Sequence, residues 1–157
     1  TGEDTLSLHD ALPIYIAVIY IPDSAALLRD EVIPMPMHVI INASYKPINP
    51  EDKYYDFEGC YSVDSVYGKV PRYRTIEVTY QDEDGRQYKY IAKGLYARVL
   101  QHEIDHLNGV LFTERLDQNS IYGPPKEMLK IRRQELPLEK REIFDNLLIQ
   151  KAVKIED

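Results

Sequence analysis

The 157-residue sequence predicts an α+β domain in which small antiparallel sheets surround a central metal-binding helix, with a further helix at the C-terminus. Short apolar or alternating segments bounded by turn residues indicate strands. One longer segment has apolar residues at helical spacing and carries a His-Glu-x-x-His pattern. The length fits a single domain, and an apolar share of 44% is enough for one core.

The elements follow from local patterns in chain order. The predicted strands are residues 15–21, 34–42, 75–80 and 87–92, with a loop at 48–56 and a turn at 81–85. Residues 94–108 are predicted to form a helix, with Gly109 at its left-handed C-terminal cap. Pro124 and Pro125 open a predicted helix that reaches Arg133, because proline is tolerated in a first turn. Residues 136–153 are predicted as a charged amphipathic helix with a solvated face.

Composition narrows the function classes. A net charge of −7 argues against a nucleic-acid-binding surface. The chain has no run of 18 apolar residues, so neither a transmembrane helix nor a membrane partner is expected. No basic region precedes an apolar stretch near the N-terminus, and the single cysteine fits a reducing compartment. We therefore expect a cytoplasmic location, with an organelle as the alternative if the N-terminus is truncated.

The predicted central helix contains the most informative motif, Gln101-His102-Glu103-Ile104-Asp105-His106. Positions i and i+4 share one face of a helix, so His102 and His106 can point at one metal ion. Glu103 is rotated by about 100° from His102, which places its carboxylate beside the metal, where it can take a proton from a bound water. The pattern is typical of zinc hydrolases.

A catalytic metal site usually has three protein ligands, so a third must be found. The candidates are Cys60, upstream of the helix, and a downstream glutamate such as Glu114 or Glu127. Cys60 is the only cysteine and cannot form an internal disulfide, although a lone cysteine can also be an inert buried thiol. Gly59 would allow close approach of the backbone to the metal, and Glu58 could orient a ligand.

Two motifs at this spacing resemble the peptide deformylase family. They are Glu58-Gly59-Cys60-Tyr61-Ser62 and the segment from Gln101 to Gly109 that contains both histidines. Val70-Pro71-Arg72 and Ala97-Arg98-Val99 also resemble that family, and the resemblance extends over about residues 16 to 120. Either motif alone would be less specific than the pair.

The resemblance implies a site and a reaction. It makes Cys60, His102 and His106 the ligands of one divalent metal, Fe(II) foremost, with Zn, Ni or Co able to replace it. The reaction would remove the formyl group from N-formyl-methionine of nascent peptides, which implies a role in protein biosynthesis and an association with the ribosome. Glu103 would be the general base, and the backbone N–H of Tyr61 would stabilise the oxyanion. Arg72, Glu58 and Gly59 would lie along the bound substrate.

One family motif has no counterpart in this chain. The family carries Gly-x-Gly-x-Ala-Ala-x-Gln before the strand that corresponds to residues 15–20, and its Gln donates a hydrogen bond to the oxyanion. Residues 1–14 do not resemble the family, and we interpret them as translated adapter sequence joined to an N-terminally truncated deformylase-like domain, residues 15–157. A divergent N-terminus is the alternative interpretation.

The missing Gln predicts impaired deformylase activity, because loss of one oxyanion donor typically costs ~10²–10³ in rate. Two alternatives stay open. The domain could bind metal without turning over, or it could be a metalloprotease that uses His102, His106 and Glu127.

Overall fold

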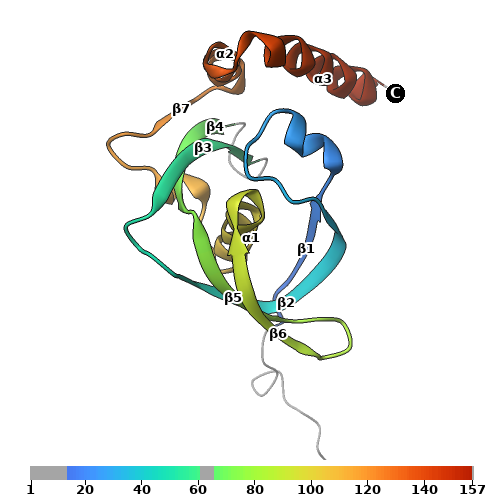
Figure 1. Cartoon of the computed structure of the whole chain (residues 1–157), viewed down its shortest axis with the longest axis vertical. Helices are drawn as coiled ribbons and strands as arrows, with labels where there is room; N and C mark the ends of the chain where they lie inside the picture. The colour runs from blue at the N-terminus through green and yellow to red at the C-terminus, as the bar shows by residue number, and fades with distance from the viewer. Residues whose placement is uncertain (1–13, 61–65, 157) are drawn as a thin grey trace, which may run out of the picture.

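The central helix α1, Gly94–Leu107, lies between two small antiparallel sheets, as Figure 1 shows. The computed structural model describes residues 14–60 and 66–156, without the side chains of Cys60 and residues 150–156. In this part of the chain, no helix is both long and apolar enough to cross a membrane. The predicted α+β class, with antiparallel sheets around a central helix and a helix at the C-terminus, is confirmed.

The first sheet has four strands in the order β1-β2-β5-β6, and every neighbouring pair is antiparallel. Its strands are β1 Ile16–Ile21, β2 Met35–Pro47, β5 Thr75–Gln81 and β6 Gln87–Lys93. A 3-10 helix, η1 (Asp23–Leu27), follows β1. The inward side chains of β1 alternate with exposed ones along the strand, as expected for a sheet with one buried face.

The second sheet has three strands in the order β3-β4-β7. They are β3 Lys53–Cys60, β4 Val66–Tyr73 and β7 Ile121–Gly123, and both strand pairs are antiparallel. Another 3-10 helix, η2 (Phe112–Arg115), follows α1, and the chain ends in α2 Pro125–Glu135 and α3 Leu138–Glu156. In Figure 1, α2 and α3 lie together at one end of the molecule, beside the β3-β4 end of the second sheet.

A glycine with positive φ marks each end of helix α1. Gly94 has φ +60°, and a Cβ at this position would lie 2.3 Å from the carbonyl oxygen of Glu31, so the close approach requires glycine. That carbonyl accepts the N–H of Leu95 at 3.2 Å. At the other end, Asn108 is the C-terminal cap, and Gly109 has the φ of +77° predicted for the residue that follows it.

The main core lies between the first sheet and α1. It contains buried apolar residues of β1, β2, β5, β6 and α1, among them Ile19, Ile40, Ile76 and Leu100 with no measurable exposure. A smaller cluster around Val70 and Phe112 lies beneath the second sheet. Helix α1 is therefore enclosed by apolar contacts, and polar side chains on it that face inward must find partners inside the protein.

Several predicted elements are confirmed and others need correction. Strands β1, β5 and β6, helix α1 and helix α2 lie within one or two residues of their predicted positions. The strand predicted at 34–42 continues to Pro47, the loop predicted at 48–56 contains the start of β3, and α3 begins after Pro137 rather than at residue 136. The sequence patterns did not predict β4 or β7.

Candidate active site

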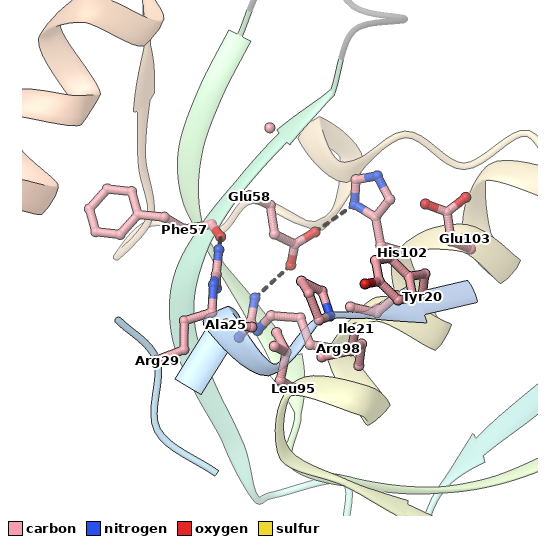
Figure 2. Close-up of a pocket in the computed structure, with 13 residues that line it drawn as sticks. Tyr20, Ile21, Ala25, Arg29, Phe57, Glu58, Leu95, Arg98, His102 and Glu103 are labelled. Carbon is pink, nitrogen blue, oxygen red and sulfur yellow. Dashed lines mark hydrogen bonds and ion pairs between the residues drawn. The ribbon is translucent and has the colours of Figure 1, made fainter. Parts of the chain in front are cut away.

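His102 is held from the side by a buried glutamate. Its Nδ1 lies 2.8 Å from Oε1 of Glu58, which comes from β3 and is 8% exposed (Figure 2). A carboxylate can only accept at this distance, so the contact favours the imidazole tautomer with its proton on Nδ1. The Nε2 lone pair is then available to bind a metal, which is the usual arrangement for a histidine ligand.

Glu58 is in turn held by two arginines. Arg72 of β4 donates from Nε and Nη2 to the two carboxylate oxygens at 3.0 and 2.9 Å, and Arg98 of α1 donates to Oε2 at 2.5 Å. Burial alone would raise the pKa of Glu58, but the hydrogen bond from His102 and the two guanidinium groups outweigh it and hold the pKa at about 2. Glu58 is therefore a carboxylate whose position is fixed.

The charged network continues past Arg72 to Asp105, one turn further along the same face of α1. Arg72 Nη1 donates to Asp105 at 2.6 Å, and Asp105 also accepts from Arg115 and from the hydroxyl of Tyr45 at 2.7 Å. Burial opposes ionisation of Asp105, yet its bonds with Arg115, Tyr45 and Arg72 lower its pKa below the usual range. We call Arg98, Glu58, Arg72, Asp105 and Arg115 the interior charge network.

A pocket of about 290 Å³ opens beside His102 and Glu103. Glu58, Gly59 and Arg98 line it together with the end of β1, the start of η1 and the apolar side chains of Leu95 and Val99. In Figure 2, the carboxylate of Glu103 lies next to the His102 ring on the side away from Glu58. The pocket thus combines a histidine held in one orientation, an adjacent carboxylate and an apolar wall, as hydrolytic sites do.

The structure describes the positions of the other two predicted metal ligands, His106 and Cys60, only in part. His106 is one turn further along α1 and is exposed, and it is not among the residues that line the pocket. Cys60 ends β3, directly after two residues of the pocket wall, but its side chain lies outside the described part of the structure. Tyr61, the predicted backbone donor, lies outside the described residues as well.

The two glutamates considered as a third ligand do not join the histidines. Among the residues that the structure describes, no three His, Cys, Asp or Glu side chains form a group that could hold a metal. Glu114 accepts the N–H of Leu111 at 2.8 Å and so caps η2, and Glu127 lies in the first turn of α2. The ligand set with Glu127 that a metalloprotease would need is therefore not assembled.

The predicted substrate residues have different positions. Glu58 and Gly59 line the pocket, but both oxygens of Glu58 are already bonded within the protein. Arg72 is 2% exposed, and its guanidinium is bonded to Glu58 and Asp105. As placed, Arg72 offers no free face to a substrate, because a buried cation between two carboxylates is fully engaged. All described contacts of the Arg72 guanidinium are therefore within the protein, and its contact with substrate stays a prediction.

Two polar side chains on α1 belong to the site although no role was predicted for them. Arg98 contacts Glu58 and three backbone carbonyls of the second sheet, and Asp105 contacts Arg72. The spacing of Arg98, His102 and Asp105, at i, i+4 and i+7, places them along one helix face and is the sequence signal that could have connected them. A charged residue on the buried face of a helix implies a buried partner.

Three comparisons identify the family. The family model described as Polypeptide deformylase matches residues 12–121. Peptide deformylase 2 of Rickettsia conorii is 43% identical over 105 residues, which cover 67% of this chain and 51% of that protein. A peptide deformylase of Opitutus terrae is 40% identical over 114 residues, 71% of this chain and 58% of that one. The chain belongs to the polypeptide deformylase family, and it spans about half the length of these relatives.

Solved structures of deformylases share the fold. A class I type b peptide deformylase from Acinetobacter baumannii, crystallised with the ligand K1U, matches with a TM-score of 0.55 and 30% identity over 64% of this chain and 61% of that chain. The same enzyme with bound Met-Ala-Ser matches with a TM-score of 0.53, 31% identity and coverage of 64% and 60%. These likenesses support the arrangement of the two sheets around α1.

The residues present are chemically suited to a metal, as judged from the one described contact of a predicted ligand and from their order in the chain. Glu58 leaves Nε2 of His102 as the free ring nitrogen, His106 follows at i+4, and the chain passes from Gly59 of the pocket wall directly to the only cysteine. Imidazole and thiolate ligands suit Fe(II), Zn, Ni and Co.

Proposed function

We propose that this chain is a metal-dependent hydrolase that removes the formyl group from N-formyl-methionyl peptides. One observation carries the proposal: the buried Glu58 holds His102 at 2.8 Å in the pocket where Glu103 stands beside it. Membership of the deformylase family and the Met-Ala-Ser bound to the Acinetobacter baumannii enzyme support a formylated peptide as substrate. Protein biosynthesis in the cytoplasm, on peptides leaving the ribosome, is the setting that this substrate implies.

The proposed site would hold one divalent metal, Fe(II) foremost, between Cys60, His102 and His106. When bound, the metal would supply Lewis acidity to the attacking water and to the formyl oxygen. Glu103 would take the proton of that water and then deliver it to the leaving amine. The apolar wall that includes Leu95 and Val99 would receive the methionine side chain and exclude water from the pocket.

Turnover by a protein of these 157 residues alone is proposed to be low, because residues 1–14 contain no Gln that could act as the family's oxyanion donor. Loss of one such donor typically costs ~10²–10³ in rate. The backbone N–H of Tyr61 would remain as the other donor. The second candidate, a domain that binds metal without turnover, differs from this proposal only in the size of the residual rate.

Formate release from formyl-Met-Ala-Ser by the Co(II)-loaded protein tests the proposal. We expect slow, saturable release that Glu103→Gln abolishes, because the variant removes the proton acceptor and keeps the shape of the side chain. Glu127→Gln is the matched control and should leave both metal binding and the rate unchanged. Cys60→Ser should lose metal, which the metalloprotease alternative does not predict.

Two outcomes would contradict the proposal. Metal-loaded protein that releases no more formate than Glu103→Gln would leave only the non-catalytic candidate. Loss of metal in Glu127→Gln, with metal retained in Cys60→Ser, would favour the metalloprotease.

A further inference from the structure

The carboxylate of Glu58 is fixed on every side that the structure describes. Oε1 accepts from His102 Nδ1 at 2.8 Å and from Arg72 Nη2 at 2.9 Å. Oε2 accepts from Arg72 Nε at 3.0 Å and from Arg98. Arg72 is the one partner that touches both oxygens, so the orientation of its guanidinium plane sets the plane of the carboxylate and, through it, the direction of the imidazole ring.

The orientation of Arg72 depends on Asp105. After the pair with Glu58, its remaining terminal nitrogen Nη1 donates to Asp105 Oδ2 at 2.6 Å. Asp105 is itself fixed, since Oδ1 accepts from the Tyr45 hydroxyl and from Arg115 Nη2, and Oδ2 accepts from Arg115 Nε at 2.9 Å. Arg72 is thus clamped between two carboxylates that are each 8% exposed or less.

His102 and Asp105 are three residues apart on α1, yet the contacts that link them leave the helix and return to it. The path runs from Asp105 to Arg72 on β4, then to Glu58 on β3, and back to His102. This closed path of side-chain contacts connects one turn of α1 to two neighbouring strands and fixes the rotation of the helix about its axis. It therefore sets where the ring of His102 points, which packing of apolar side chains alone leaves less defined.

We propose that Asp105 is a positioning residue for His102, acting through Arg72 and Glu58, and that Arg115 supports it from the surface. Asp105 does not touch the pocket and is not a catalytic residue in this assignment. The proposal rests on the proposed function in one respect only, that His102 is a metal ligand. Loss of the partner that contacts a metal-bound histidine typically lowers metal affinity by ~10–100-fold, and Asp105 acts on that partner, Glu58, through Arg72.

Asp105→Asn tests the proposal with the volume of the side chain preserved. In metal-free protein, ¹⁵N NMR of the His102 ring reports its tautomer, and we expect the single Nδ1–H form of the parent to become a mixture. Competition titration with Co(II) reports affinity, and we expect it to weaken by ~10-fold, the lower end of that range, because Asp105 acts through Arg72 and Glu58. Neither readout depends on turnover, so both remain informative if the protein proves not to hydrolyse formyl peptides.

Two further variants keep the test decisive. Arg115→Gln changes a residue whose side chain is 43% exposed and that touches neither Glu58 nor His102, so it should fold even if Asp105→Asn does not. We expect it to weaken Co(II) binding several-fold with the same change in tautomer. Arg133→Gln removes an exposed pair with Asp145, at 2.8 and 2.9 Å, and is the control that should change neither readout.

The result that would overturn the proposal is a parent-like His102 tautomer, together with Co(II) affinity within twofold of the parent, in whichever of the two variants folds. If the parent protein binds no Co(II), the tautomer alone decides. Loss of formate release in Glu103→Gln, with no response of His102 to either variant, would leave the proposed function standing and remove this inference.

Discussion

Two arginines, Arg72 in β4 and Arg74 directly after it, make the same kind of contact in opposite surroundings. Arg72 bridges Glu58 and Asp105 and is 2% exposed, whereas Arg74, two residues later, bridges Glu31 and Asp52 with a side chain that is 37% exposed. Each guanidinium joins carboxylates from two separate segments of the chain. Only the first set reaches His102, so burial and contact with the candidate site occur together in one set and are both absent from the other.

The comparison separates stability from positioning. An exposed pair gives a small net gain, because solvent screens it and the side chains lose entropy when they pair. A buried pair must first overcome desolvation, which by itself would lower the pKa of Arg72, although Glu58 and Asp105 more than compensate and raise it. Compared with apolar side chains of similar volume, the interior charge network therefore adds little net stability to the fold. Removal of Arg72, however, leaves Glu58 and Asp105 in the core without the cation that bridges them.

The largest expected effect comes from Arg72→Met. Breaking a buried pair by removing one partner typically costs about 3–5 kcal/mol, because the remaining carboxylates stay buried. We expect the free energy of unfolding of the metal-free protein in urea to fall by an amount in this range. Arg74→Met is the matched control, and exposed pairs contribute at most about 1 kcal/mol. Equal losses in the two variants would show that burial does not distinguish the two sets.

Features that depend on local sequence could be predicted, whereas contacts between distant residues could not. Helix α1, its glycine C-terminal cap and the strands β1, β5 and β6 follow from patterns within a few neighbouring residues, and all were predicted. The same holds for the family itself, since two short motifs carry it. His102 and Glu103 were predicted for one pocket and share it.

The elements that were missed have physical reasons. Gly68 and Pro71 interrupt the strand pattern of β4, and a proline is tolerated there because β7 pairs only with Tyr67 to Lys69, which leaves that side of Pro71 unpaired. The contact of Asp105 with Arg72 joins residues 33 positions apart, and that of Arg98 with Glu58 joins residues 40 apart. No local pattern encodes such a partner, so the sequence did not predict that Arg72 pairs with Glu58 and Asp105 inside the protein.

The second largest expected effect is that of acid on the stability that Glu58 contributes. The pKa of Glu58 is about 2 in the folded protein against an ordinary value of 4.5, so its ionised form is favoured by folding. Its stabilising contribution is complete above pH 4.5 and is lost as the pH falls toward 2. At about 1.4 kcal/mol per pH unit, the loss is about 3 kcal/mol. Urea unfolding of the metal-free parent and of Glu58→Gln, from pH 6 to pH 2, measures it as a narrowing difference between the two curves.

The exposed set supplies the control for that measurement. Glu31 lies at the surface with half of its side chain exposed, so Glu31→Gln should differ little from the parent at any pH in the range. A difference between the parent and Glu58→Gln that stays constant down to pH 2 would contradict the expected ionisation of Glu58 and would point to packing as the cause of its effect.

The smallest expected effect is that of salt, and it separates the two arginines by mechanism. The Debye length falls to about 3 Å in 1 M salt, so added NaCl should remove whatever Arg74 contributes at low ionic strength. The cost of Arg72→Met should stay nearly unchanged, because ions do not reach a guanidinium that is 2% exposed. Unfolding of both variants and the parent in 0.05 M and 1 M NaCl measures this. A cost of Arg72→Met that also disappears in 1 M NaCl would mean that solvent enters the interior charge network, and His102 would then lack the rigid support that its position requires.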